Sequence, residues 1–231
     1  MDGNGRWASE RNLPRIAGHR AGVDAVRAVV EECARLGIGY LTLFAFSTEN
    51  WKRPREEVGA LMTLLDQYLK KELETLMENN IRLKSIGRIS DIPAKSQQTL
   101  NEVCRHSSGN TGLTLILALS YSGRDDILQA AREWGKAVQR GEAEPDSLQA
   151  EDFSSFLSTA DVPDPDLLIR TSGEMRISNF LLWQVAYTEF YVTPRLWPDF
   201  NADDLRSAIK VYQSRERRFG LTSEQLRSGE R

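Results

Sequence analysis

The chain has 231 residues, a formal net charge of −3, a pI near 5.6 and 40% hydrophobic residues. A chain of this length buries a sizeable core, and we expect residues 1–231 to form a single domain. The charge argues against a dedicated nucleic-acid binder, which carries a strong basic excess. The two cysteines, Cys33 and Cys104, lack metal-ligand spacing and indicate a reducing, cytoplasmic location.

Strand-like and helical patterns alternate along the chain. Apolar residues at helical spacing predict a helix over Gly22 to Leu36, and an apolar run predicts a buried strand over Tyr40 to Phe46. The other expected elements are helix Arg55 to Asn79, strand Ile81 to Ile86, helix Pro93 to Arg105, strand Leu113 to Leu119, helix Asp125 to Arg140, a short helix near Glu151 to Leu157, strands Leu167 to Ile169 and Glu189 to Val192, and helix Ala202 to Arg218. This alternation predicts an α/β fold with a mostly parallel central sheet flanked by helices.

Two further expectations concern the first strand of the sheet and contact with membranes. The opening motif, residues 1–7, has no strand before it, so either a first strand is missing upstream of Met1, which we expect, or the sheet starts one strand short. No apolar stretch reaches the roughly 18 residues that a membrane-spanning helix needs. Transient contact with a membrane, to collect or deliver an apolar molecule, is compatible with such a chain.

Polar motifs directly follow the expected strands. Residues 47–54 (STENWKRP) follow Phe46, residues 120–124 (SYSGR) follow Leu119, and residues 170–176 (RTSGEMR) follow Ile169. Because ligands of open α/β sheets bind at the carboxyl ends of the strands, we expect these loops and residues 1–7 to share one rim. Their glycines, arginines, serines and asparagines are typical of a site for anionic phosphate groups.

The opening motif combines an acid with a flexible backbone. Gly3, Asn4 and Gly5 allow a tight turn that aims successive N–H groups at an anion, and the alternative is an ordinary turn. Asp2 suits a phosphate site if a divalent cation such as Mg²⁺ lies between the carboxylate and the phosphate.

Arginine and histidine side chains extend the same chemistry. Arg170 and Arg176, joined by Ser178, carry the donors that bind phosphate, with surface salt bridges as the alternative. The loop 47–53 repeats this donor set. His19 lies near an expected helix start, where phosphates dock, which favours a functional role over a structural one.

Long blocks of the sequence resemble the cis-prenyltransferase family, and within it the undecaprenyl pyrophosphate synthases (isoprenyl transferases). The blocks occur in the family's order at residues 2–8 (DGNGRWA), 18–19 (GH), 46–54 (FSTENWKRP), 109–114 (GNTGLT), 170–174 (RTSGE), 176–184 (RISNFLLWQ), 197–200 (WPDF) and 217–220 (RRFG). The resemblance implies an Mg²⁺-dependent transferase that adds isopentenyl diphosphate repeatedly to farnesyl diphosphate with cis double bonds. It also implies a homodimer and, as product, a long-chain polyprenyl diphosphate such as undecaprenyl diphosphate, the carrier lipid of cell-wall peptidoglycan synthesis.

The resemblance further implies a role for each matching residue. The catalytic residues would be Asp2, His19, Ser47 and Asn50, and the metal residues Asp2 and Glu189. The substrate-binding residues would be Gly3, Asn4, Gly5, Arg6, Trp7, Arg15, His19, Ser47, Glu49, Trp51, Arg53, Arg170, Arg176, Ser178 and Arg218.

Within this set the resemblance separates two diphosphates. Residues 3–6 would cradle the allylic diphosphate, and Arg170, Arg176 and Ser178 the diphosphate of isopentenyl diphosphate. Residues 51–53 would belong to a mobile loop that closes over substrate, and Arg218 would reach the partner's site in a homodimer.

The growing chain needs an apolar slot beside the phosphates. Candidates for its lining, each of which fits an ordinary core equally well, are Leu43, Ala45, Leu61, Leu64, Leu65 and Leu113. A short-chain synthase is the alternative within the class, and the volume of the slot distinguishes the two. A silent subunit of a heteromeric enzyme is disfavoured because such subunits lose the DGNGR motif, and a nucleotide-binding phosphotransferase because the sequence has no P-loop.

The sequence departs from the family's pattern at three positions. Met175 stands where many relatives carry a histidine, and Ser120 and Ser122 replace the Asn and Gly of the usual NYGGR block.

Overall fold

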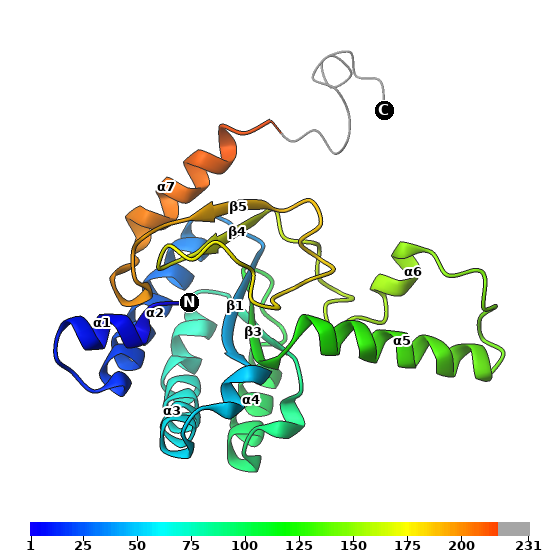
Figure 1. Cartoon of the computed structure of the whole chain (residues 1–231), viewed down its shortest axis with the longest axis horizontal. Coiled ribbons are helices and arrows are strands. Elements are labelled where there is room, and N and C mark those ends of the chain that lie inside the picture. The colour runs from blue at the N-terminus through cyan, green and yellow to red at the C-terminus, as the bar shows by residue number, and fades with distance from the viewer. Residues whose placement is uncertain (217–231) are drawn as a thin grey trace.

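Helices and strands alternate through residues 1–216, the part of the chain that the computed structural model describes (Figure 1). The helices are α1 (Asn4–Glu10), α2 (Arg15–Arg35), α3 (Arg55–Glu78), α4 (Ala94–His106), α5 (Gly123–Gln139), α6 (Ala150–Ser154) and α7 (Ala202–Gln213). The strands are β1 (Tyr40–Ser47), β2 (Arg82–Ile86), β3 (Thr114–Tyr121), β4 (Leu167–Arg170) and β5 (Glu189–Val192).

The strands form two parallel sheets. In the first, β3 lies between β1 and β2, with Thr114 opposite both Tyr40 and Arg82. In the second, β4 pairs with β5, with Leu167 opposite Glu189. The predicted α/β fold with parallel strands flanked by helices is confirmed, although the strands divide between two sheets rather than one.

The neighbouring edges of β1 and β4 border a cavity. Every residue from 37 to 47 and every residue from 162 to 171 lines it. Since successive side chains of a strand point to opposite faces, an unbroken run of lining residues means that strand edges face the cavity. The expected strand upstream of Met1 stays a prediction.

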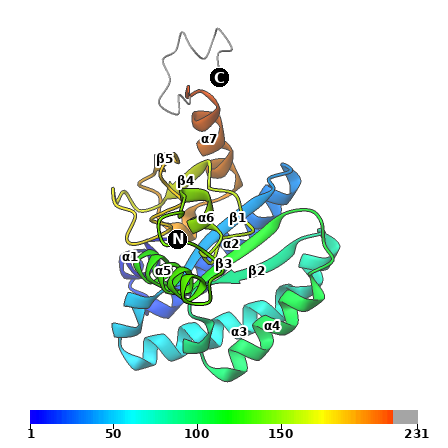
Figure 2. The same ribbon diagram turned by 90° about the vertical axis from the view of Figure 1, so that its right-hand side faces the viewer.

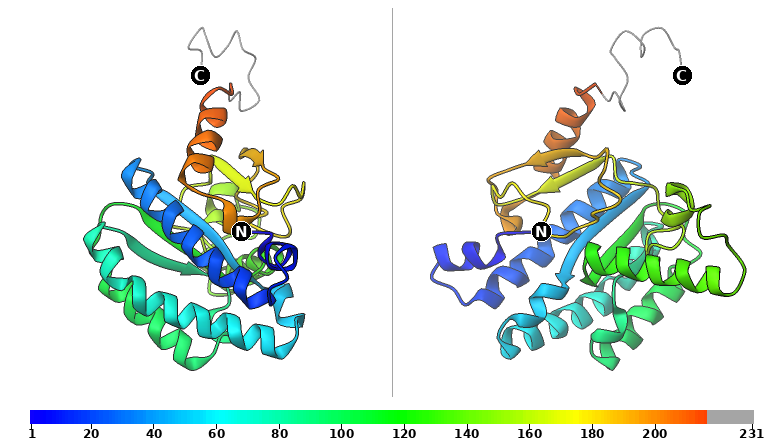
Figure 3. Two further views of the ribbon diagram at one scale, coloured as in Figure 1. Left: turned by 90° about the vertical axis from the view of Figure 1, so that its left-hand side faces the viewer. Right: turned by 45° about the vertical axis from the view of Figure 1, so that its right-hand side comes forward.

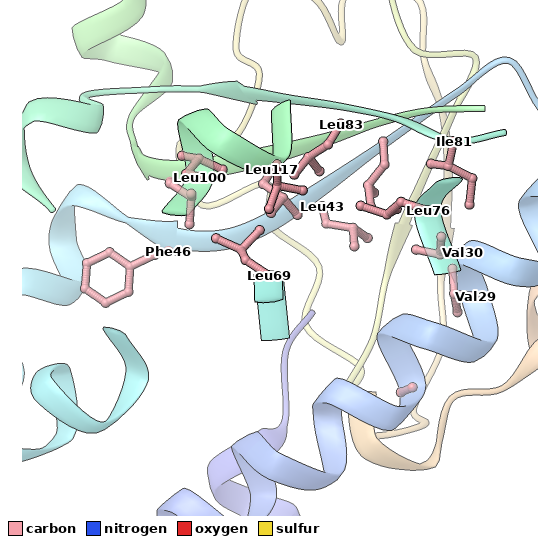
Figure 4. Close-up of a cluster of buried hydrophobic side chains, with 14 of the residues drawn as sticks. Val29, Val30, Leu43, Phe46, Leu69, Leu76, Ile81, Leu83, Leu100 and Leu117 are labelled. Atoms are coloured by element: carbon pink, nitrogen blue, oxygen red, sulfur yellow. The ribbon is translucent and has the colours of Figure 1, made fainter. Parts of the chain in front are cut away.

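Alternate residues of the central strand β3 serve two cores. Leu115 and Leu117 pack with α2, α3 and α4, whereas Ile116 and Ala118 pack with Leu168 and the segment 177–185. Figure 2 shows α3 and α4 side by side along one face of the first sheet, and Figure 3 shows α2 beside β1. Figure 4 shows the larger core, in which side chains of β1 and β3 meet those of the helices.

The first two helices differ from the prediction for local reasons. Helix α1 was not expected, because Gly3 and Gly5 suggested a turn. Gly3 adopts a left-handed conformation (φ 104°) immediately before the first turn of this helix. Helix α2 begins at Arg15, directly after Pro14, and passes through Gly18 and Gly22, which suggested a later start.

The last predicted helix, Ala202 to Arg218, is seen as α7 up to Gln213. Its start is fixed by Asn201, whose side-chain oxygen accepts hydrogen bonds from the backbone N–H groups of Asp203 and Asp204. Arg218 lies outside the described residues. Within residues 1–216, no helix combines the length and the apolar character needed to cross a membrane.

Candidate active site

The cavity has a volume of about 1420 Å³ and joins a polar rim to an apolar interior. Helices α2 and α3 and strand β1 supply apolar lining residues, among them Val23, Val26, Val29, Cys33, Leu43, Ala45, Leu61, Leu64, Leu65 and Tyr68. Of the predicted slot residues, Leu113 is buried in the core instead. The volume exceeds the roughly 300–1,000 Å³ of sites for drug-sized ligands.

Asp2 and Arg170 form the centre of the polar rim. Arg170 Nη2 donates to Asp2 Oδ2 at 2.9 Å, and the backbone N–H of Gly3 donates to Oδ1 at 2.8 Å. Thr171 Oγ1 both accepts from the N–H of Asp2 (2.9 Å) and donates to its carbonyl (2.8 Å). The end of β4 thus fixes Asp2 at the mouth of the cavity.

Asp2 is held as a carboxylate. Burial raises the pKa of Asp2, but the hydrogen bonds from Arg170 and from the Gly3 N–H outweigh this effect and leave the pKa below its usual value. No group of three or more His, Cys, Asp or Glu side chains with metal-binding geometry occurs in residues 1–216. A hard cation at Asp2 would therefore take most of its ligands from substrate oxygens and water, as Mg²⁺ commonly does.

Arg170 also organises the loop after β4. Its Nη1 donates to Ser178 Oγ at 2.8 Å and to the carbonyl of Arg176. Its Nε is buried and has no hydrogen-bond partner among the described residues. An unsatisfied buried donor next to a cavity indicates a position for an acceptor such as a phosphate oxygen.

Glu174 holds two further arginines at the rim. Its carboxylate contacts Arg6 Nη2 at 3.3 Å and Arg176 Nη1 at 2.5 Å. Arg6 also donates to Ser172 Oγ at 2.6 Å. The Arg176 side chain is 60% exposed, so an incoming anion can compete with Glu174 for its guanidinium group.

A second charged cluster joins α2 to the start of α3. Glu57 lies 3.2 Å from Arg53 Nη1, 3.4 Å from Arg15 Nε and 3.7 Å from His19 Nε2. The last distance is too long for a hydrogen bond, and the buried His19 Nε2 has no hydrogen-bond partner among the described residues. Burial, and then the charge of Arg53, lower the pKa of His19, which favours the neutral imidazole at pH 7.

The family model described as "Putative undecaprenyl diphosphate synthase" matches residues 1–220. The chain belongs to this family. It is 53% identical over 220 residues to an isoprenyl transferase of Heliobacterium mobile, covering 95% of this chain and 85% of the relative. It is 54% identical over 226 residues to an isoprenyl transferase of Geobacter sulfurreducens, covering 98% and 92%.

Solved structures of prenyl diphosphate synthases share the fold. A lavandulyl diphosphate synthase from Lavandula x intermedia, in complex with dimethylallyl diphosphate, has 37% identity and a TM-score of 0.93, with 95% of each chain covered. A probable undecaprenyl diphosphate synthase from Campylobacter jejuni has 36% identity and a TM-score of 0.77, covering 87% of this chain and 92% of that one. The predicted membership in the family is confirmed.

The structure of this prenyltransferase-family chain brings most of the predicted site residues to the cavity. The predicted residues that line it are Asp2, Gly3, Asn4, Gly5, Arg6, Arg15, His19, Ser47, Glu49, Asn50, Arg53, Arg170, Arg176 and Ser178. Among them, Asn50 Oδ1 accepts a hydrogen bond from the N–H of Ser47 at 3.1 Å, which fixes the turn after β1.

Among the predicted site residues within 1–216, three do not line the cavity. Trp7 donates to Asp199 Oδ1 at 2.7 Å and ties α1 to the segment before α7. Trp51 donates to Ser120 Oγ at 2.9 Å and packs against Phe46. Their contacts with substrate stay predictions.

Glu189 is the third of these residues. It begins β5 opposite Leu167, three residues or about 10 Å along the strands from Arg170. Its carboxylate pairs with Arg215 Nη1 at 2.7 Å. Within one chain it is thus separate from Asp2, and its metal role stays a prediction.

Sequence reasoning missed several residues that shape the site. Thr171 and Glu174 lie inside a motif that was recognised, but no role was assigned to them. Glu57 was not singled out either, because its contacts with α2 are tertiary. Asn179, next to Ser178, was likewise passed over.

Proposed function

We propose that this chain is an Mg²⁺-dependent cis-prenyltransferase. It condenses isopentenyl diphosphate successively onto farnesyl diphosphate and yields a long-chain polyprenyl diphosphate. In a bacterial cytoplasm the product would be undecaprenyl diphosphate, the carrier lipid for cell-wall peptidoglycan.

One observation carries this proposal: Asp2, Arg170 and Ser178 stand in hydrogen-bond contact at the mouth of a large apolar cavity. Guanidinium and hydroxyl groups bind diphosphate. A carboxylate among them would bind a cation, and the cation offsets the repulsion between the carboxylate and the phosphates. The cavity takes the hydrocarbon part of the same substrate. An amphipathic allylic diphosphate matches both halves of the site.

The allylic diphosphate is assigned to the start of the chain. The backbone N–H groups of residues 4–6, in the first turn of α1, lack intrahelical acceptors and would bind it together with the Arg6 guanidinium, and Asp2 would hold Mg²⁺. When bound, the cation neutralises the charge that develops on the departing diphosphate. The unpartnered Nε2 of His19 would contact anionic oxygens there and assist ionisation.

Isopentenyl diphosphate is assigned to the loop after β4. Arg170, Arg176 and Ser178 would bind its diphosphate, which would replace Glu174 as the partner of Arg176. Ser47 and Asn50, at the end of β1 on the same cavity, are assigned to removal of the proton that completes each condensation.

The cavity favours the long-chain product over the short-chain alternative. Its lining extends from Ser47 along the whole of β1 to Gly37, and α2 and α3 contribute apolar side chains along this path. The silent-subunit alternative is disfavoured because Asp2, His19, Asn50 and Arg170 are all present on the cavity.

A homodimer is proposed as the active form. Phe190 and Val192 on β5 are 41% and 36% exposed, and Val211 on α7 is 38% exposed. A strand with exposed apolar side chains suits a second copy of the chain. The mass of the protein in solution tests this proposal, and a monomer at assay concentrations would contradict it.

The proposed reaction is tested by incorporation of labelled isopentenyl diphosphate onto farnesyl diphosphate with Mg²⁺. We expect turnover by the wild type, loss of turnover in the presence of EDTA, and loss in the Asp2→Ala variant. Circular dichroism must show that the variant is folded. Turnover that withstands EDTA or Asp2→Ala would reject the metal role, and a wild type that gives no product would reject the enzymatic function.

A further inference from the structure

The loop after β4 carries left-handed backbone conformations at residues other than glycine. Ser178 has φ 49°, Asn179 φ 64° and Leu181 φ 47°. Such conformations cost about 1–3 kcal/mol each and persist only where the surroundings enforce them. Asparagine tolerates the left-handed region better than most residues, which suits Asn179 to this position.

Asn179 connects this loop to the turn after β3. Its side-chain Oδ1 accepts from the N–H of Arg124 at 2.9 Å, and its backbone carbonyl accepts from the N–H of Gly123 at 2.8 Å. Its Nδ2 donates to Ser122 Oγ at 2.8 Å. Ser122 is a departure of this chain from the family's usual glycine, so this last bond depends on a residue particular to the chain.

Asn179 also connects the loop to the turn after β1. Its Nδ2 donates to Glu49 Oε1 at 2.9 Å, and both residues line the cavity. One asparagine therefore joins the loops that follow β1, β3 and β4. Its neighbour Ser178 is held in turn by Arg170 Nη1 at 2.8 Å.

We propose that Asn179 is a positioning residue for the loop that binds isopentenyl diphosphate. Its side chain holds the left-handed turn so that Arg176 and Ser178 face the cavity together. This inference rests on the proposed function, because it assigns the loop to that substrate.

Asn80 provides a matched control elsewhere in the chain. It too is left-handed (φ 54°), its Oδ1 accepts from the N–H of Thr111 at 2.9 Å, and its carbonyl accepts from the N–H of Gly112 at 3.0 Å. Asn80 is not among the described residues that line the cavity. Glycine at either position keeps the backbone conformation and removes the side-chain bonds.

The test compares Asn179→Gly with Asn80→Gly. We expect Asn179→Gly to raise the KM for isopentenyl diphosphate about 10-fold, the scale on which loss of a supporting partner acts. The KM for farnesyl diphosphate should change less than about 2-fold. Asn80→Gly should lower the melting temperature similarly and leave both KM values unchanged. A KM for isopentenyl diphosphate that stays at the wild-type value in Asn179→Gly, or an equal rise for both substrates, would overturn the proposal.

Two further variants separate the contributions of the individual Asn179 hydrogen bonds to the KM for isopentenyl diphosphate. Ser122→Gly removes one acceptor of Asn179 Nδ2 and should raise the same KM less than Asn179→Gly does. Asn179→Asp keeps an acceptor for the Arg124 N–H, but it cannot donate to Glu49, and it should fail to restore the wild-type KM. Restoration by Asp would show that the bond to Glu49 is not needed for positioning.

Calorimetric binding of isopentenyl diphosphate separates failure of this inference from failure of the proposed function. A wild type that binds this substrate without turnover would reject the reaction, and weaker binding by Asn179→Gly would still support the positioning role. Equal binding by wild type and variant would reject the positioning role even where turnover occurs.

Discussion

Helix α2 packs closely on the opening motif at Gly18. A Cβ atom at Gly18 would lie 1.9 Å from the carbonyl oxygen of Asn4, within the segment assigned to the allylic diphosphate. Ordinary carbon–oxygen contacts are about 3.3 Å or longer, so Gly18→Ala requires a displacement of about 1.4 Å. Because the carbonyl belongs to the backbone, the whole segment 2–6 must move.

The size of the effect follows from this displacement. Overpacking of a core costs about 1–3 kcal/mol, and each kcal/mol lowers the melting temperature of a chain of this size by about 2–4 °C. We therefore expect Gly18→Ala to lower the melting temperature by about 2–12 °C. A misplacement of about 1 Å near reacting groups costs about 100-fold in rate, so kcat/KM for farnesyl diphosphate should fall by about this factor.

Gly135 is the matched control because it also lies inside a helix, α5, with no atom within 4 Å of an added Cβ. Alanine is the better helix former by about 0.5–1 kcal/mol, so Gly135→Ala should raise the melting temperature by about 1–4 °C and leave turnover unchanged. Scanning calorimetry and the incorporation assay measure both quantities. A Gly18→Ala variant that matches Gly135→Ala in stability and rate would refute the close-packing argument.

Three further predictions concern the cavity and its rim. Arg170→Lys keeps the charge, but a lysine cannot reach Asp2 and Ser178 together. In steady-state assays, kcat/KM for isopentenyl diphosphate should therefore fall at least about 10-fold. An unchanged kcat/KM would show that Arg170 does not act in the site. Leu64→Trp narrows the apolar lining and should shorten the products on sizing chromatography, whereas wild-type lengths would place the hydrocarbon chain elsewhere. Burial, and then Arg53, lower the pKa of His19, so the unfolded chain binds its proton more readily. Stability should fall as the pH drops below about 6.5, and urea denaturation at two pH values should show a smaller fall for His19→Asn.

The strands and most helices could be predicted because their apolar periodicity is local. The expected bounds of β5 agree with the observed Glu189–Val192, and those of α3 differ by one residue at the end. Helix α1 could not be predicted because its glycines suggest a turn, whereas in the structure they have other roles. Gly3 takes up the left-handed position before the helix, and an added Cβ at Gly5 would lie 3.2 Å from Arg15.

The site was predictable as a set of motifs, but not as a network of contacts. Nothing local marks Glu57 as the partner of Arg15 on α2, or Asn179 as the link between three loops. Trp51 illustrates the same limit. Its motif resembles a loop over substrate, but its indole N–H donates to Ser120 on β3, which is 69 residues away in the sequence.

Sizing of the products made from farnesyl diphosphate and labelled isopentenyl diphosphate tests the central claim most directly. The account predicts a ladder of polyprenyl diphosphates ending near eleven isoprene units, the usual bacterial product that the family resemblance implies. A product that stops after one or two condensations would contradict the long-chain assignment and leave a short-chain synthase in its place.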